Sequence, residues 1–216
     1  ADTVEFKYEE KYKQIFDLYI DNSCTDKQML GDKTVEDSIA EFAMGRCAMI
    51  QNGNWAWEQI SNTEGSVINE ENIKIMPVYM GLTNEVVQGL CVGTENYLAI
   101  NSKVTEEEQQ LAIDFLTWLF TSEAGKKYVV EELKFVTPFK GYDNYEYGDP
   151  LANQVVEWMS DEGVNTIPWV FVSFPSVNFK NEFGDALLRY CQGDMEWEEV
   201  VTTVRESWEE ESKSRE

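Results

Sequence analysis

One stretch, from Gly45 to Trp57, constrains the fold more than any other part of the chain. Its first part, residues 46–51, is mostly apolar and bounded by glycine, which predicts a short strand buried on both faces. An Asn-Gly turn follows, and we expect Asn54 to cap a helix that carries Trp55 and Trp57. A strand that passes directly into a helix is typical of α/β proteins, whose ligands bind where the strand ends.

The two tryptophans after this turn make the same place a candidate binding site. Trp55 and Trp57 are two residues apart on a helical turn, so their side chains point in different directions. We expect Trp55 to face a pocket and Trp57 to pack inward. An aromatic ring stacks on the apolar face of a sugar, and the amides of Asn52 and Asn54 exchange hydrogen bonds with hydroxyls, so a neutral polyol is favoured. The alternative is that both indoles belong to the core, because tryptophan is highly buried on average.

The charge of the chain argues against one class of partner. Its 216 residues include 41 acidic and 17 basic side chains, a formal net charge of −24. This charge repels nucleic acids and anionic membrane surfaces, so no nucleic-acid partner is expected. We interpret the charge as a solvated surface; the alternative is an acidic pocket for a cationic solute such as a polyamine. No run of 18 apolar residues occurs, so no transmembrane helix is predicted.

Histidine and cysteine usage narrows the chemistry further. The chain has no histidine, and its four cysteines show no CxxC spacing. Neither a metal site, a cofactor nor a histidine-activated nucleophile is therefore predicted. Cys47 and Cys91 lie in apolar patterns and are expected to be buried thiols. Cys24 lies in a polar turn and can pair only if the fold brings a partner close, so the cysteines leave the cellular compartment open.

Helical periodicity and capping residues predict most other elements. Thr34 and Thr105 each begin a capping box, and Asp149 precedes a proline at a helix start. The glycine-containing segment 88–101 is expected to be a hinge crossing, because glycine permits a bend or a close approach by a ligand. Helices are expected near residues 12–22, 34–44, 54–60, 105–120, 122–133, 150–159, 179–190 and 197–208, and extended segments at 73–77, 135–139 and 167–175.

Three segments, in this order, resemble one protein family. The chain is similar to the extracellular sugar-binding proteins of ABC importers, the maltose-binding-protein-like group of periplasmic-type binding proteins. The segments that carry the resemblance are EFAMGRCAMIQNGNWAW, ENYLAINSKVTEEEQQLAIDFLTWLFTSEAGKKYV and DALLRYCQGDMEWEEVVTTVRESW. Their shared order makes the resemblance more specific than any one motif.

The resemblance implies a type II periplasmic-binding-protein-like α/β fold, in which two lobes joined by hinge crossings close on a ligand. It implies a binding protein and not an enzyme, which delivers a mono- or oligosaccharide to the membrane permease of an ABC importer. It also implies an extracellular or periplasmic location, with a lipid anchor at the cell surface. Trp55 takes the place of the family's cleft tryptophan, beside Asn52 and Asn54. Further ligand contacts are expected from Glu95 and Asn96, next to a hinge strand, and from Trp169, in the variable cleft wall.

Compared with the family pattern, we expect the chain to be a C-terminal portion in which the first lobe is largely absent. We expect residues 1–92 to belong to the second lobe, 93–139 to the first lobe, and 140–216 to return to the second lobe with the closing helices. The apolar helix face with Phe115, Leu119 and Phe120 would then lack its partner. Such a face predicts a dimer, a swapped assembly or a partner chain.

Two other function classes stay open. A glycoside hydrolase uses paired carboxylates, and the chain is rich in them, but no pair stands out by its spacing. A binding module for a polyamine, a peptide or a second protein surface is the other alternative. A cationic ligand would need several carboxylates that converge over an aromatic face.

Overall fold

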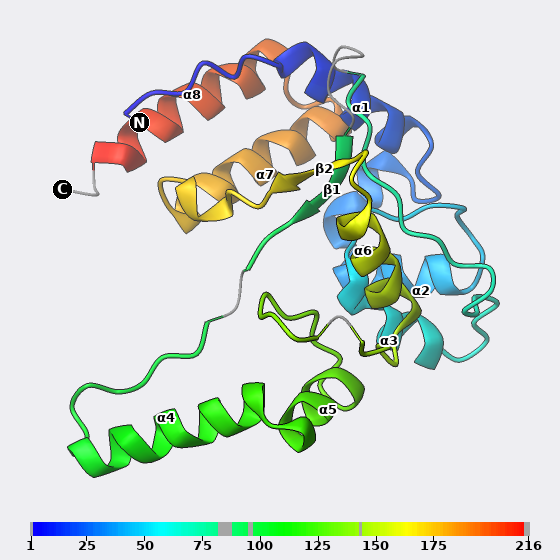
Figure 1. Ribbon diagram of the computed structural model, residues 1–216. Coiled ribbons are helices and arrows are strands. Elements are labelled where there is room, and N and C mark those ends of the chain that lie inside the picture. Colours follow the sequence, from blue (N-terminus) through cyan, green and yellow to red (C-terminus); the bar gives the residue numbers. More distant parts are fainter. Residues whose placement is uncertain (1, 82–87, 95–96, 143, 214–216) are drawn as a thin grey trace. The chain divides into compact units, whose positions relative to one another are not determined.

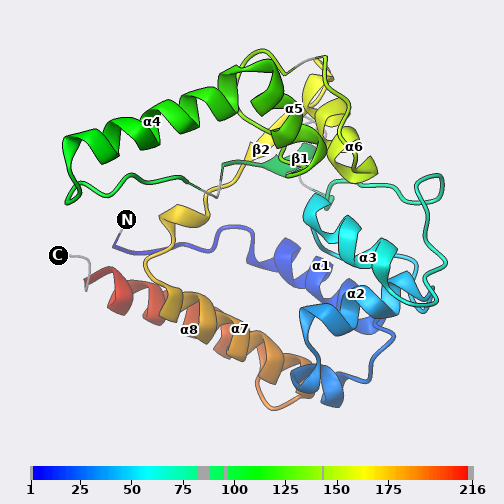
Figure 2. The same cartoon turned by 90° about the horizontal axis from the view of Figure 1, so that it is seen from below.

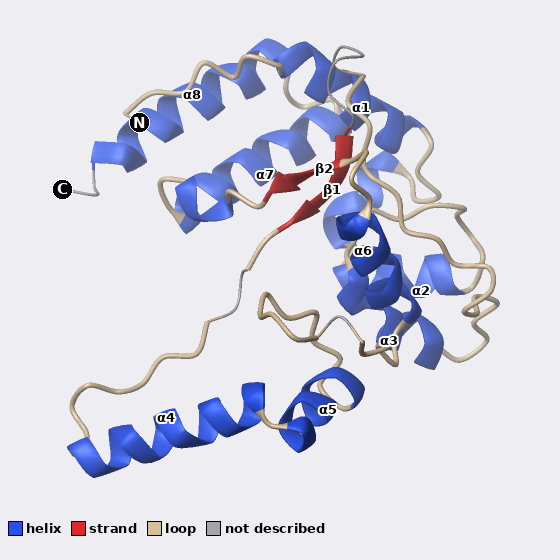
Figure 3. Cartoon of the chain, in the orientation of Figure 1, coloured by secondary structure: helices blue, strands red, loops and turns tan. Residues whose placement is uncertain are grey.

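The computed structural model describes residues 2–81, 88–94, 97–142 and 144–213 (Figure 1). Over these residues the chain is mostly helical, with one two-stranded sheet (Figure 3). It divides into two compact units. Unit 1 contains Ala1–Ile50, Tyr79–Val86 and Val170–Glu216, and unit 2 contains Gln51–Val78 and Val87–Trp169. The lobe boundaries expected from the family pattern stay a prediction.

Unit 1 is built around a pair of long helices near the end of the chain. Helices α7 (Val177–Gln192) and α8 (Trp197–Lys213) lie side by side in both views (Figures 1 and 2), and a left-handed Gly193, with φ 81°, joins them. Helices α1 (Glu9–Asp21) and α2 (Val35–Ala43) and the 3-10 helices η1 (Lys27–Asp32) and η3 (Phe171–Ser173) complete the unit. Its core consists of Ala186, Trp197, Val200 and Val201, packed against Phe6, Tyr12, Phe183, Leu187, Tyr190 and Met195.

Unit 2 contains the sheet and the candidate site. Strands β1 (Gln88–Val92) and β2 (Asn165–Pro168) are parallel, with Cys91 opposite Ile167. The helical elements are η2 (Asn54–Ala56), α3 (Trp57–Asn62), α4 (Glu106–Thr121), α5 (Glu123–Glu131) and α6 (Pro150–Ser160). A Cβ at Gly125 would lie 2.3 Å from the Leu119 carbonyl, so only glycine lets α5 fold back on the end of α4. The core contains Leu119, Val129, Val130, Tyr142, Tyr147 and Ala152.

The predicted helix starts are confirmed where a side chain caps the backbone. The Thr34 hydroxyl accepts a hydrogen bond from Asp37 N at 3.1 Å, and the Thr105 hydroxyl accepts one from Glu108 N at 3.3 Å. In both boxes the acidic side chain also accepts from the threonine N–H. The Asp149 side chain caps α6 without a box, because it accepts from the backbone N–H groups of Leu151 and Ala152. These bonds satisfy N–H groups that a helix start otherwise leaves unpaired.

The strand predicted at residues 46–51 is wrong. Instead of joining a sheet, Arg46 N donates to the Glu41 carbonyl at 2.9 Å and so closes the end of α2. The segment that follows is not buried on both faces, because Met49 is 72% exposed. The segment is a loop that follows α2, and Gly45, with a left-handed φ of 72°, lies between the helix and this loop.

The extended segment predicted at residues 73–77 is also not a strand. A side chain takes the place of a strand partner there: Gln154, on α6, accepts from Ile75 N at 2.9 Å and donates to Ile73 O at 3.2 Å. One amide thus satisfies the backbone groups that a neighbouring strand would otherwise pair. In segment 167–175, predicted as an extended loop, the chain continues β2 and then turns through η3.

Gly89 and Gly93, in the predicted hinge crossing, allow the chain around β2 to pack closely against β1 within unit 2. A Cβ at Gly89 would lie 2.7 Å from Val164 Cγ1, and one at Gly93 would lie 2.4 Å from Trp169 Cβ. The close approach expected at these glycines is therefore made by the chain around β2. Cys91, expected to be buried, is exposed because its strand has only one neighbour in the described sheet.

The apolar stripe of α4 is only partly exposed. Leu119 is 8% exposed, and Phe120 packs against the unit 2 core. The prediction that these two residues lack a packing partner is therefore wrong. Phe115 is 55% exposed, together with Leu111 and Trp118 on the same side of the helix. None of the helices in the described part of the chain is both long and apolar enough to cross a membrane.

Candidate functional site

The two indoles differ in exposure as expected, and a pocket at Trp55 stays a prediction. Trp55 is 63% exposed and Trp57 is 7% exposed. Trp55 lies in the short 3-10 turn η2 and Trp57 begins α3, and their two-residue spacing turns the side chains in different directions. Trp57 therefore anchors the turn in the core while Trp55 remains open to solvent.

The Trp55 indole rests on Gly53. A Cβ added at Gly53 would lie 2.2 Å from Cζ3 and 2.3 Å from Cη2 of the ring, closer than van der Waals contact allows. Only glycine at this position lets the six-membered ring lie against the backbone. The rest of the ring remains available for stacking.

The amides beside Trp55 have two different roles. The Asn52 side-chain oxygen accepts from Gly53 N at 2.8 Å and so fixes the turn. Asn54, predicted to be the N-cap, is instead the first residue of η2; the cap position is Gly53, which makes no side-chain bond. Within the described residues the Asn54 side chain has no hydrogen-bond partner, and it is half-buried. Its donors and acceptor are free for a ligand hydroxyl.

The other predicted contact residues are not joined to this group. Trp169 is 37% exposed, and its backbone N donates to Val92 O at 3.2 Å, which extends the pairing of β1 with β2. Over the described part of the chain, no ring contact links Trp169 to Trp55. Glu95 and Asn96 lie outside the described residues.

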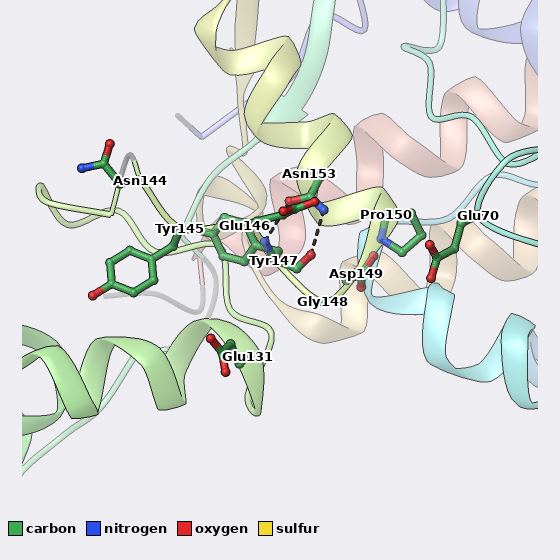
Figure 4. Close-up of a pocket in the computed structure, with 10 residues that line it drawn as sticks. All are labelled: Glu70, Glu131, Asn144, Tyr145, Glu146, Tyr147, Gly148, Asp149, Pro150 and Asn153. Carbon is green, nitrogen blue, oxygen red and sulfur yellow. Dashed lines mark hydrogen bonds between the residues drawn. The ribbon is translucent and has the colours of Figure 1, made fainter.

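A second feature of unit 2 was not predicted as a site. A cavity of about 580 Å³ lies where the loop after α5 enters α6 (Figure 4). The Asn153 side chain accepts from Tyr147 N at 2.9 Å and donates to Tyr147 O at 2.8 Å, which holds this loop in place. Acidic, amide and tyrosine side chains dominate the lining: Glu70, Glu131, Glu146, Asp149, Asn144, Asn153, Tyr145 and Tyr147, with Gly148 and Pro150.

The signal for this cavity was present in the sequence. Residues 141–149 read GYDNYEYGD, a run of aromatic and acidic residues that periodicity assigns only to a loop. What periodicity does not reveal is that Glu70 and Glu131, distant in the sequence, line the same cavity. Among the described residues, no group of three or more acidic or cysteine side chains is arranged to hold a metal ion.

Asp149 is the buried carboxylate of this cavity, at 5% exposure. Its Oδ1 accepts from Leu151 N at 2.8 Å and from Ala152 N at 3.1 Å. Burial raises the pKa of Asp149, although these two hydrogen bonds and the charge of Lys134 act in the opposite direction. The carboxylate is therefore held at the helix start at an energetic cost, because burial disfavours the charged form.

An exposed indole beside an amide that has no partner among the described residues offers a surface on which a ligand can bind. The comparison with known families is more specific. The sequence matches the family of bacterial extracellular solute-binding proteins over residues 6–155, and the chain belongs to this family. No curated protein and no solved structure matches the chain significantly.

Membership of this family settles the function at a coarse level. The family is a binding family and not an enzymatic one, and its members work outside the cytoplasm. Its partners are a small-molecule solute and the membrane permease of a transporter. The expectation of a solute-binding protein is thus confirmed, and the nature of the solute is a separate question.

Proposed function

We propose that the solute is a mono- or oligosaccharide, taken up by an ABC importer, and that Trp55 stacks on one of its rings. The observation that carries this proposal is the 63% exposure of the Trp55 side chain beside a hydrogen-bonding amide. The ring offers an apolar surface, and Asn54 offers both a donor and an acceptor. A neutral sugar requires both and needs no charge.

The remaining site contacts and the architecture belong to the same proposal. Glu95, Asn96 and Trp169 would complete the contacts with sugar hydroxyls, in a cleft between two lobes that close about hinge crossings. The lobes would follow the boundaries 1–92, 93–139 and 140–216. A lipid anchor would hold the protein near its permease.

Calorimetry with a panel of mono- and oligosaccharides tests the proposal. We expect one sugar to bind and Trp55→Ala to lower its affinity by about tenfold, the equivalent of roughly 1.4 kcal/mol. Trp169→Ala, run in parallel, separates stacking at Trp55 from stacking elsewhere. If no sugar binds the unaltered chain, the carbohydrate proposal is wrong while the family assignment stands.

A cationic solute such as a polyamine is the second candidate, and the acidic cavity of unit 2 favours it. Four carboxylates line that cavity together with two tyrosines. Carboxylates that converge near aromatic faces attract an ammonium group. Spermidine binding that weakens steeply with added salt, and that is lost in Glu131→Gln with Glu146→Gln, would support this candidate over the sugar.

A further inference from the structure

Two cysteines of unit 1 that are distant in the sequence, Cys24 and Cys47, lie near Glu41. The Cys24 thiol donates to Glu41 Oε2 at 3.4 Å, from the turn that follows α1. Arg46 N donates to the Glu41 backbone carbonyl at 2.9 Å at the end of α2, and Cys47 is the next residue in the chain. Glu41 itself is held by Lys33 Nζ at 2.8 Å.

Cys24 also acts on the Cys47 thiol. Burial raises the pKa of Cys47, and so do the charge of Cys24 and a hydrogen bond that the two side chains share. Both cysteines lie outside helices and strands. Cys24 is exposed, so an oxidant can reach it from solvent.

The extracellular location of the family supplies the chemical setting. Thiols that lie together in an oxidising compartment are converted to disulfides, whereas cytoplasmic thiols are kept reduced. We propose that Cys24 and Cys47 form a disulfide bond in the mature extracellular protein. The bond closes the segment that contains η1 and α2 onto the end of α1.

The two remaining cysteines have other surroundings. Cys191 lies on α7, where the charge of Lys27 acts on it, and Cys91 lies on β1 of unit 2. Neither has a thiol neighbour among the interactions of the described residues. They are expected to remain as thiols and serve as internal controls.

The oxidant is a small disulfide or a thiol–disulfide oxidoreductase. A cysteine thiolate attacks one sulfur of the oxidant disulfide, forms a mixed disulfide and releases one thiolate. The second cysteine, as its thiolate, then attacks the protein sulfur of the mixed disulfide and releases the second thiolate. Two protein thiols are oxidised, one oxidant disulfide is reduced to two thiols, and the two protons go to the released thiolates. Formation is faster at about pH 8 than at neutral pH, because the thiolate is the attacking species.

Peptide mapping of the whole chain tests the pairing. The reduced protein is incubated with oxidised glutathione, its free thiols are alkylated, and it is digested with trypsin without reduction. Cys24 and Cys47 fall on separate tryptic peptides, residues 14–27 and 47–74, with Cys91 on 75–103 and Cys191 on 190–205. We expect the first two peptides to be joined, at about 2 Da below the sum of their masses, and the other two to be alkylated.

A stability measurement gives a second readout. The oxidised protein should melt about 5–10 °C above the reduced protein. Cys24→Ser and Cys47→Ser should each abolish this difference, and Cys91→Ser should retain it. The proposal is overturned if Cys24 and Cys47 are both alkylated after oxidation, or if either is joined to Cys91 or Cys191.

Discussion

At the scale of single residues, Gly53 determines where the Trp55 ring can lie. Gly53→Ala places a methyl group at the position now filled by the indole, 2.2 Å from Cζ3, so the ring must move away. Because Trp55 is mostly exposed, we expect a small change in stability, within about 0.5 kcal/mol. Sugar affinity should fall about as far as in Trp55→Ala, roughly tenfold.

Two measurements separate this effect from general damage. The indole N–H resonance of Trp55, assigned by its absence in Trp55→Phe, should shift in Gly53→Ala even without ligand. Gly184→Ala is the matched control, because a Cβ there meets nothing within 4 Å and the residue lies within α7. An unchanged Trp55 resonance in Gly53→Ala would show that the glycine does not position the ring.

Asp149 gives a prediction about pH. Because folding raises the pKa of Asp149 above its ordinary value of 3.8, ionisation destabilises the folded state relative to the unfolded state. The contribution of Asp149 to stability should therefore be lost as the pH rises from below 3.8 through the raised pKa. Asp149→Asn keeps an acceptor for the cap and cannot ionise, so it should gain stability relative to wild type over the same interval.

The comparison with Asp149→Ala isolates the cap itself. Alanine removes both hydrogen bonds to the start of α6 and should cost about 1 kcal/mol of unfolding free energy relative to Asp149→Asn at every pH, because neither side chain ionises. Urea unfolding at several pH values measures all three proteins. A constant difference between wild type and Asp149→Asn across this interval would contradict the raised pKa.

At the scale of elements, a polar link joins α1 to α7 inside unit 1. The Tyr190 hydroxyl donates to Asp17 Oδ1 at 2.8 Å, and Lys13 Nζ donates to Asp17 Oδ2 at 2.7 Å. Burial acts to raise the pKa of Asp17, but the hydrogen bonds from Lys13 and Tyr190 outweigh it and hold that pKa below 3.8. Asp17 therefore contributes stability above pH 3.8, and this contribution is lost as the pH falls through the lowered pKa.

Tyr190→Phe tests this link with little change in packing. We expect it to cost about 1 kcal/mol of unfolding free energy at neutral pH, and less in acid, where Asp17 is protonated. Tyr8→Phe is the control, because the Tyr8 hydroxyl has no hydrogen bond in the described part of the chain. Equal losses in the two variants would mean that the Tyr190 hydroxyl contributes nothing specific.

Helices were predicted well and strands poorly, for a physical reason. A helix start is a local event: Thr34, Thr105 and Asp149 bond to N–H groups two or three residues away, and the sequence contains both partners. A strand needs a partner from elsewhere in the chain, and short apolar runs do not reveal whether one exists. At residues 73–77 the partner is the side chain of Gln154, which no periodicity indicates.

The candidate site divides in the same way. The opposite exposure of Trp55 and Trp57 follows from their spacing and could be predicted. The support that Gly53 gives to the Trp55 ring depends on backbone geometry, and the acidic cavity depends on Glu70 and Glu131 meeting residues 144–153. Neither the support of the ring nor the cavity could be predicted from the sequence, because both depend on how the backbone folds.

The exposed face of α4 carries a prediction about assembly. Leu111 is 70% exposed, and Phe115 and Trp118 continue its row along the helix. An apolar row of this kind favours association with a second chain or a partner. We expect the chain to self-associate at high concentration and Phe115→Glu to abolish this, measured by light scattering during size-exclusion chromatography. Leu18→Glu, on α1 and also exposed, should not have this effect.

At the scale of the whole molecule, the net charge of −24 opposes folding through self-repulsion. Raising NaCl from about 10 mM to about 150 mM shortens the screening length from roughly 30 Å to roughly 8 Å. Salt also weakens the exposed ion pairs, such as Lys27 with Asp21, but each of these contributes at most about 1 kcal/mol. With 41 acidic residues against 17 basic ones, relief of repulsion should outweigh this loss.

We therefore expect the melting temperature to rise by about 2–4 °C over this salt interval, which corresponds to roughly 1 kcal/mol. Choline chloride at equal ionic strength should give the same shift, because screening depends on ionic strength and not on the cation. A rise with NaCl alone would indicate specific binding of sodium. A fall with both salts would mean that paired charges stabilise the chain more than its excess negative charge destabilises it.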